Sequence, residues 1–531
     1  MSQPIRSSRR LFLGALLAAP FVLRYTPAYA GASAPTKRFT ILHSNDPHGH
    51  LMPFSYADKT APGDFVSYMP KHVQIGGVAR RATVVGRIKR KEKNVHVFDL
   101  GDSMDGSPFS VEYLGKADYE ANSLVGFDMG TFGNHDFNMT TDQFKEMRSF
   151  IKYPMVLANV YDKTTKQPIE QPYVIENWDG LKVALFGLTT YSSRTYKAIS
   201  DTCEMRQPAD VAKELVPKLR QQADLVILLS HCGYDEDKII AQDIPGIDLI
   251  VGAHSHTRLP VGDYEAAKNP KRGDPQGTVI VQAHAWGGEL GRLDLMAQPG
   301  PDGKWRVAQY TASLLTMDDS VAEDKRVKAV VEKYWKPISA KYGEIVGKAA
   351  DEFVDIKGED ATNYYLMCDA MLAETPGAEF ELENFGGVRA PVLRGDITRG
   401  DLINVDPFTN TIFTFEIKGS DLKKLLGYTR PATSKTLRYV AKATPRTDGS
   451  GKSDWAFVDG TLNGAPIEDE KIYKGAASSY YFGGEVKKYA INPVDTKNMR
   501  LDLLANYIKK NSPISPTPDG RVKLEGGTAY N

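Results

Sequence analysis

Six short apolar runs constrain the fold of this chain more than any other feature, because they recur between amphipathic stretches throughout residues 39–296. Runs of this length, without alternating polar residues, are typical of strands that are buried on both faces of a sheet. The stretches at 79–90 and 209–222 are amphipathic, so the alternation predicts α/β layering. The runs are Phe39–Leu42, Val95–Leu100, Val183–Leu188, Leu225–Leu229, Leu249–Val251 and Val279–Val281.

A second region follows the Gly- and Pro-rich stretch Pro299–Lys304. Apolar residues at helical spacing between Val327 and Ile338 predict an exposed connecting helix, which Pro337 should end or bend. A chain of 531 residues is too long for one hydrophobic core, so we expect two domains. The second domain is expected to contain a helix around 364–372 and strands at 411–417 and 472–477. The expected units are a leader at 1–30, a first domain at 36–300, the connecting helix at 320–344 and a second domain at 345–531.

Charge and cysteine content exclude several classes of protein. The 66 basic residues are balanced by 66 acidic residues, whereas a protein that binds nucleic-acid polymers normally carries a basic excess. A small anionic substrate needs only a local positive site. The three cysteines, Cys203, Cys232 and Cys368, are too few and too scattered for a cysteine-rich zinc site, but a disulfide between Cys203 and Cys232 stays open.

The N-terminus has the pattern of an export signal. Arg9 and Arg10 precede an apolar run at 11–23, and Ala28 and Ala30 form a small-x-small cleavage site. The alternative, a membrane anchor, is disfavoured because the run is shorter than the ~20 residues that span a bilayer. We therefore expect a cleaved twin-arginine signal peptide, export by the twin-arginine translocase to the periplasm or the extracellular space, and no stable membrane anchor.

Residues of metal-ligand type follow four of the predicted strands, and one further glycine-containing loop carries two more. Open α/β sheets place their sites at the carboxyl ends of strands, so we expect these side chains to converge. Each motif alone has an ordinary interpretation, such as a turn aspartate or a hydrogen-bonded buried histidine. Five motifs in one region favour a metal centre. The residues are Asp46, His48, Asp102, Asn134, His135, His231, His254 and His256.

A shared carboxylate gives such a centre its chemistry. Asp102 is expected to bridge two divalent ions roughly 3.5–4 Å apart, which hold an attacking hydroxide and neutralise charge on a phosphoryl group. Of the other histidines, His43, His72 and His96 are expected to have no site role. For His50 and His284 both alternatives, lining the cleft or lying outside it, stay open.

In these motifs the chain resembles the calcineurin-like metallophosphoesterases and, among them, the exported bacterial 5′-nucleotidase and 2′,3′-cyclic-nucleotide phosphodiesterase family. The resemblance implies a four-layer calcineurin-like α/β sandwich followed by a second α/β (α+β) substrate-binding domain. It also implies two divalent ions, and the mixed nitrogen and oxygen ligands favour Mn, Zn, Fe or Co. By this resemblance Asp46, His48, Asp102 and His256 hold one ion, and Asp102, Asn134, His231 and His254 hold the other.

The same resemblance gives His135 a catalytic role without metal ligation. Many members have an aspartate that pairs with this histidine, whereas the present chain has Asn138 at that position, as in the cyclic-nucleotide branch. Because an amide stabilises an imidazolium less than a carboxylate does, we expect His135 to be less readily protonated.

The region around 384–411 resembles the substrate-binding domain of 5′-nucleotidases. The resemblance implies that Asn384 hydrogen-bonds the nucleoside, that Arg389 binds a phosphate or carboxylate-like oxygen, and that Phe408 stacks on the base. The second stacking aromatic maps onto 478–485, where the usual aspartate is replaced by Glu485. The candidates for that ring are Tyr480, Tyr481 and Phe482, of which we select Tyr481 and Phe482 as substrate-binding residues.

We therefore expect a metal-dependent phosphoric ester hydrolase that acts on small nucleotides outside the cytoplasm. Three alternatives remain: a 2′,3′-cyclic-nucleotide phosphodiesterase, a thiosulfohydrolase, and an exported nucleotide-binding protein without turnover. The thiosulfohydrolase is disfavoured because its histidine loop differs from Gly133-Asn134-His135, and the inactive protein because the expected ligand set is complete.

Overall fold

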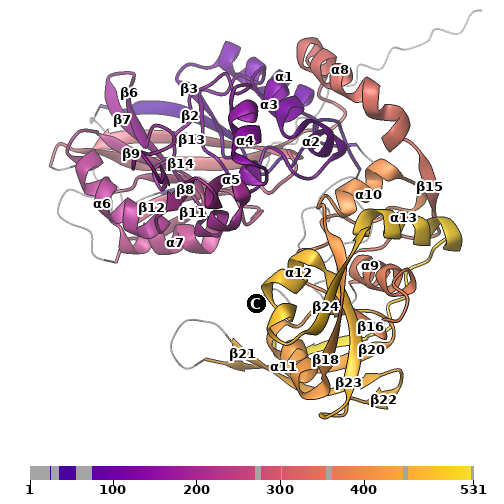
Figure 1. The fold of residues 1–531 in the computed structure, drawn as a ribbon. Helices are drawn as coiled ribbons and strands as arrows, with labels where there is room; N and C mark the ends of the chain where they lie inside the picture. Colours follow the sequence, from indigo (N-terminus) through magenta and orange to yellow (C-terminus); the bar gives the residue numbers. More distant parts are fainter. Residues whose placement is uncertain are drawn as a thin grey trace, which may run out of the picture.

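Two lobes, each built from sheets and helices, make up the chain (Figure 1). The computed structural model describes residues 24–25, 35–55, 74–268, 275, 277–300, 302–354, 361–446 and 453–527. Except for Arg24 and Tyr25, the expected signal peptide lies outside the described residues, as does His72. Within the described part of the chain, no helix is both long enough and apolar enough to cross a membrane.

The first lobe contains two six-stranded sheets. In the first sheet the strand order is β1-β14-β13-β2-β3-β4, with β2 parallel to β3 and antiparallel to β13. In the second sheet the order is β11-β12-β10-β9-β7-β6, with β7, β9, β10 and β12 parallel. The strands of the first sheet are β1 (Arg24–Tyr25), β2 (Lys37–Ser44), β3 (Val95–Asp99), β4 (Met129–Gly130), β13 (Glu289–Pro299) and β14 (Trp305–Thr316). Those of the second are β6 (Tyr173–Trp178), β7 (Leu181–Thr189), β9 (Leu225–His231), β10 (Leu249–Val251), β11 (Asp263–Ala266) and β12 (Gly277–Val281).

The two sheets pack face to face and helices cover their outer faces, which gives four layers. Between the sheets, Phe39 and Ile41 of β2 belong to the same buried cluster as Val183 of β7 and Leu225 of β9. The outer face of the first sheet packs on α1, and that of the second on α6 and α7. The helices and short elements of this lobe are α1 (Val78–Lys91), α2 (Pro108–Tyr113), α3 (Lys116–Asn122), η2 (His135–Phe137), α4 (Thr141–Arg148), β5 (Val160–Asp162), η3 (Tyr191–Thr195), α5 (Lys197–Ser200), β8 (Cys203–Met205), α6 (Pro208–Arg220) and α7 (Tyr234–Asp243).

The hairpin of β13 and β14 extends the first lobe beyond residue 300. The stretch Pro299–Lys304, expected to separate the two regions, includes the turn of this hairpin, where the Gly300 N–H donates to the Lys304 carbonyl at 2.8 Å. β14 then pairs with β13 along its whole length. The first of the two sheets therefore extends to Thr316, the last residue of β14.

A single helix, α8 (Lys325–Tyr342), links the lobes and packs on α1, α2 and α3 (Figure 1). Asp324 caps its N-terminus by accepting hydrogen bonds from the N–H groups of Arg326 and Val327. Pro337 lies inside the helix, which continues for five more residues, so this proline does not end it.

The second lobe contains a five-stranded sheet, β19-β16-β23-β18-β24, a four-stranded sheet, β22-β21-β20-β25, and the pair β15-β17. Its strands are β15 (Ile345–Ala349), β16 (Phe380–Glu383), β17 (Gly395–Thr398), β18 (Thr411–Lys418), β19 (Ala432–Thr433), β20 (Leu437–Pro445), β21 (Ser453–Leu462), β22 (Ala465–Pro466), β23 (Ile472–Ser478), β24 (Ile491–Met499) and β25 (Val522–Glu525). Its helices are α9 (Thr362–Ala373), α10 (Arg399–Val405), α11 (Gly419–Thr429), α12 (Ser479–Gly484), η4 (Val486–Lys488) and α13 (Arg500–Asn511).

All three cysteines are buried free thiols. Cys203 lies in β8 and Cys232 follows β9, and no disulfide joins them. The open question about this pair is thereby answered.

Candidate metal centre

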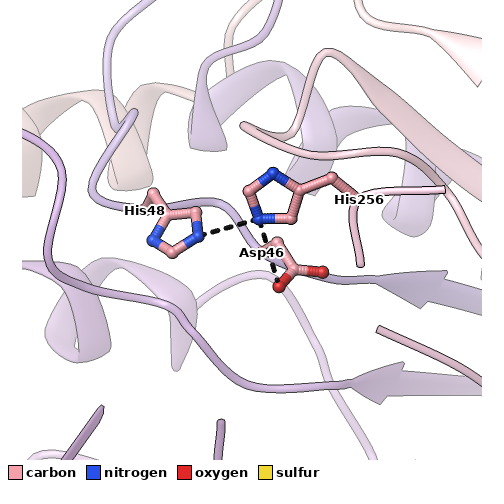
Figure 2. Close-up of side chains that lie close together, drawn as sticks. All are labelled: Asp46, His48 and His256. Carbon is pink, nitrogen blue, oxygen red and sulfur yellow. Dashed lines mark hydrogen bonds and ion pairs between the residues drawn. The ribbon is translucent and has the colours of Figure 1, made fainter. Parts of the chain in front are cut away.

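Five loops of the first lobe bring the candidate ligands together. Asp46 and His48 follow β2, and Asp102 follows β3, as the strand-end argument predicts. His231 is the last residue of β9, and the loop after β10 carries the remaining two histidines. Figure 2 shows that Asp46, His48 and His256 point toward one another from two of these loops.

The ligand atoms lie close enough to share cations. Three overlapping groups each have their ligand atoms within 4.8 Å: Asp46, His48 and His256; His48, Asp102 and His135; and Asp102, His231 and His254. The Nε2 atoms of His48 and His256 are 3.1 Å apart (Figure 2). His231 Nε2 lies 3.1 Å from an oxygen of Asp102 and 3.6 Å from one of Asp46. Asp102 is therefore the carboxylate common to two of the groups.

The hydrogen bonds of two histidine rings, together with a buried amide oxygen, fit cation binding. His231 Nδ1 donates to the Leu100 carbonyl at 2.6 Å, and His48 Nδ1 lies 3.1 Å from the Asp105 carbonyl. Each ring is thereby oriented with its Nε2 toward the carboxylates and the other imidazoles. The carbonyl oxygen of Asn134 is buried and has no hydrogen-bond partner among the described residues. Imidazole nitrogens, carboxylates and an amide oxygen together suit a divalent transition metal.

The pKa shifts of His231 and Asp46 also indicate that the cluster favours a bound positive charge. Burial alone lowers the pKa of His231, but the charges of Asp102 and Asp46 outweigh it and raise that pKa to about 10. Burial raises the pKa of Asp46 to about 7, with the charge of Asp102 adding to the effect. Two carboxylates this close attract either a proton or a cation.

Most of the candidate ligands have a strained backbone conformation. Asp46, His48, Asp102, His254 and His256, five of the seven candidate ligands, have φ between 46° and 73°. Non-glycine residues adopt this left-handed region rarely, and such strain gathers at functional sites. Gly133 allows the loops to approach closely, because a Cβ atom there would lie 2.1 Å from Asp102 Oδ1.

His135 has a carboxylate partner that the sequence did not reveal. Its Nδ1 donates to Asp105 Oδ2 at 2.7 Å, and the Asn138 amide donates to the same oxygen at 2.7 Å. Burial lowers the pKa of His135, but the charges of Asp102 and Asp105 together with this hydrogen bond raise it above its ordinary value. The expectation of a less readily protonated His135 was therefore wrong. Asn138 contacts the partner carboxylate rather than His135 itself.

The other histidines lie outside this cluster. His50 stacks on Trp286 with ring centroids 5.2 Å apart and an interplanar angle of 20°, beside the loop that carries His48. His43 is buried in β2 and His96 stacks on Trp178, so neither faces the candidate ligands. His284 is half-buried near Asn45, whose amide donates to the His284 carbonyl.

Two residues of the second lobe reach this cluster. The Phe408 ring lies 6.4 Å from the His135 ring, centroid to centroid, at an interplanar angle of 29°. Arg389 lies near enough for its charge to oppose protonation of His48, His254 and His256. A positive side chain and an aromatic ring therefore stand opposite the candidate ligands.

Two family matches cover both lobes. Residues 39–258 match the calcineurin-like phosphoesterases, and residues 345–491 match the 5′-nucleotidase C-terminal domain. The protein belongs to the 5′-nucleotidase family of calcineurin-like phosphoesterases. It is a metal-dependent phosphoric ester hydrolase with the two-domain α/β fold of that family.

Individual relatives of this 5′-nucleotidase family member align along almost the whole chain. The protein UshA of Yersinia enterocolitica is 27% identical over 560 residues, with 94% of this chain and 97% of the relative covered. A 5′-nucleotidase of Vibrio parahaemolyticus is 26% identical and covers 95% of each chain. The structure of a 5′-nucleotidase precursor from Thermus thermophilus superimposes with a TM-score of 0.80 at 24% identity, over 92% of this chain and all of the other.

In the 5′-nucleotidase C-terminal domain, the selection of Tyr481 and Phe482 as base-stacking residues was wrong. Tyr481 is 4% exposed, and its hydroxyl is hydrogen-bonded to the hydroxyl of Thr429. Phe482 is 8% exposed and stacks on Phe413 with centroids 4.3 Å apart. Both rings are core residues, whereas Tyr480 is 71% exposed.

A buried arginine ties two loops of this domain together. Arg500, the first residue of α13, donates to Asp406 and Glu383 and to the Gly387 carbonyl, and its side chain is fully buried. Glu383 precedes the turn that carries Asn384 and Arg389, and Asp406 precedes Pro407 and Phe408. The Asn384 side chain donates to its neighbour's carbonyl within that turn.

Proposed function

We propose that this protein is an exported two-metal hydrolase that cleaves phosphate esters of nucleotides. The observation that carries the proposal is the position of Phe408 and Arg389, which face the candidate metal ligands from the second domain. A nucleotide with its phosphate at the candidate ligands and its base against Phe408 would reach from the first domain to the second. The name of the 5′-nucleotidase relative from Vibrio parahaemolyticus supports the same substrate class.

The two domains take separate parts in this proposal. Residues 36–300, together with β14, form the hydrolytic domain, α8 connects the two, and residues 345–531 form the substrate-binding domain. We assign one divalent ion to Asp46, His48, Asp102 and His256, and the other to Asp102, Asn134, His231 and His254. Mn, Zn, Fe and Co all suit these donors.

The metals would supply an activated water nucleophile and positive charge beside the phosphoryl oxygens. His135 faces the same cluster with its Nδ1 hydrogen held by Asp105, which directs the opposite nitrogen of the ring toward the cleft. In that position it donates a hydrogen bond to the phosphoryl group or a proton to the leaving oxygen. Arg389 binds a further phosphate oxygen or a carboxylate-like group.

The second substrate class is the 2′,3′-cyclic nucleotides, because Asn138 occupies the position of an aspartate in many relatives. Export by the twin-arginine translocase to the periplasm remains part of the proposal. It is supported by the arginine pair at 9–10 and by the apolar run and small-x-small site that follow it.

A metal-reconstitution screen tests the proposed function. The mature chain is treated with chelator, reloaded separately with Mn²⁺, Zn²⁺, Fe²⁺ or Co²⁺, and assayed with nucleoside monophosphates, 2′,3′-cyclic nucleotides, an aryl phosphate and thiosulfate. We expect the highest kcat/KM for a nucleotide. Thiosulfate as the best substrate, or fewer than one ion bound per chain, would contradict the proposal.

Two variants separate metal binding from chemistry in this screen. His135→Ala is expected to keep its metal content while kcat falls by about 10²–10⁴-fold, because the general acid is lost. Asp102→Ala is expected to lose both metals, since its carboxylate is shared. His96→Gln, a substitution in β3 beside Trp178, is the matched control and should behave as the wild type.

A further inference from the structure

A tyrosine of the first domain contacts one of the candidate ligands. Tyr196 lies between η3 and α5, in the connection that follows β7. Its hydroxyl accepts a hydrogen bond from the side-chain amide nitrogen of Asn134 at 3.1 Å. Its ring centroid is 6.0 Å from that of His135. Tyr196 therefore borders the candidate metal centre and His135 at once.

The contact fixes the direction of the Asn134 carbonyl. The side-chain amide is planar, so the nitrogen that donates to Tyr196 determines where the oxygen points. That oxygen is buried and has no hydrogen-bond partner among the described residues. A buried amide oxygen without a partner is costly unless a ligand satisfies it. In the arrangement proposed above, the ligand is a metal ion.

The loop that carries Tyr196 is itself anchored to the centre. The Thr190 N–H donates to the carbonyl of His231 at 2.9 Å, and the Tyr196 N–H donates to the Ser193 carbonyl at 3.0 Å. The Tyr196 carbonyl accepts hydrogen bonds from the N–H groups of Ile199 and Ser200 of α5. These contacts hold the backbone of Tyr196 in place, so its hydroxyl is presented to Asn134 from a fixed position.

The Tyr196 hydroxyl also retains a hydrogen to donate. A phenol both accepts and donates, and the bond from Asn134 uses only an acceptor position. Within the described ranges, no acceptor lies in hydrogen-bonding position for this hydrogen. The side chain is half-buried rather than enclosed, and it is close enough to Tyr480 of the second domain for the two hydroxyls to interact electrostatically. The exposed part of the Tyr196 side chain thus faces the space between the two domains.

We propose that Tyr196 is a positioning residue that holds the carbonyl oxygen of Asn134 toward the metal centre and donates its own O–H to a phosphate oxygen of the substrate. This inference rests on the proposed function and adds a tyrosine contact to it. The phosphate would then be bound from the domain that holds the metals, opposite Arg389.

The test compares Tyr196→Phe with a matched control, Tyr191→Phe. Both substitutions remove one hydroxyl from the same segment, and the Tyr191 ring packs on the Arg194 guanidinium at 4.4 Å. Metal affinity of the chelator-treated proteins is measured by competition with a chromogenic chelator, without reference to activity. For Tyr196→Phe we expect one of two binding events to weaken by about 10–100-fold, as for other residues that orient a ligand.

The second measurement uses inorganic phosphate as the probe. Its inhibition constant is determined at saturating metal, so that metal loss does not contribute. We expect an increase of about 10-fold or more for Tyr196→Phe, because a hydrogen bond to a charged group is lost, and no change for Tyr191→Phe. Unchanged metal affinity in Tyr196→Phe would overturn the positioning role, and an unchanged phosphate constant would overturn the donor role. A wild-type chain that bound no metal would overturn the proposed function as well, whereas wild-type binding with a silent Tyr196→Phe would overturn this inference alone.

Discussion

At the scale of single residues, His135 obtains its carboxylate from a loop other than its own. Asp105 lies three residues beyond Asp102 and accepts hydrogen bonds from both His135 and Asn138 through one oxygen. A carboxylate at position 138 would face that of Asp105 across the same short distance and would raise the pKa of one of the two acids. The amide of Asn138 therefore complements Asp105, because it donates a hydrogen bond to the carboxylate.

This pairing predicts that the acid and the amide can exchange places. Asp105→Asn is expected to lower kcat by about 10²-fold or more, because His135 loses the partner that orients and charges it, while metal content stays near that of the wild type. The double variant Asp105→Asn with Asn138→Asp should recover a large part of that loss, since a carboxylate again lies within reach. Steady-state kinetics of the four proteins give kcat and KM separately. A double variant no faster than Asp105→Asn would show that the carboxylate is required at position 105 itself.

At the scale of elements, burial decides what the sequence can predict. The apolar runs at 183–188, 225–229 and 249–251 became β7, β9 and β10 with small differences at the ends, because both faces of these strands are covered. Strand β13 was missed because Arg292 and Asp294 interrupt its apolar pattern, and their ion pair forms only in the fold.

The residues of the candidate site also fall into those that could be predicted from the sequence and those that could not. Ligand-type residues directly after a strand could be found from their position in the sequence. Asp105 and Tyr196 could not, because each acts through a contact with a residue of another loop and neither belongs to a motif with a fixed spacing.

An element-scale prediction concerns the start of α13. Arg500→Met leaves Glu383 and Asp406 buried without their cation, so the free energy of unfolding should fall by about 3–5 kcal/mol. Arg399→Met, in α10, removes the cation from a more exposed ion pair with Asp502 of α13 and should cost no more than about 1 kcal/mol. Urea denaturation measures both. Because Arg500 joins the turn of Arg389 to the loop of Phe408, KM for a nucleotide should also rise in Arg500→Met. A KM equal to that of the wild type would contradict this link.

At the scale of the whole molecule, α8 sets the distance between the substrate loops and the metal centre. Ile338 and Tyr342 of α8 pack with Ile403 of α10, and Tyr342 donates to Glu112 of α2 at 2.5 Å. One helix thus touches both domains on the side where they join (Figure 1). Across the gap, the Phe408 ring is presented to His135. In the proposed function, the chemistry therefore belongs to the first domain and the recognition of the base to the second.

This division predicts that base recognition can be removed without loss of hydrolysis. Phe408→Ala should weaken nucleotide binding by about 1–3 kcal/mol, because stacking on the base is lost. Hydrolysis of a small aryl phosphate, which has no base, should change little. The comparison of kcat/KM for the two substrates measures the effect, and Tyr428→Ala, at an aromatic side chain that is 65% exposed on α11, is the control. Equal losses on both substrates would mean that Phe408 supports the metal centre through His135 rather than binding the base, and the separation of roles between the domains would then be wrong.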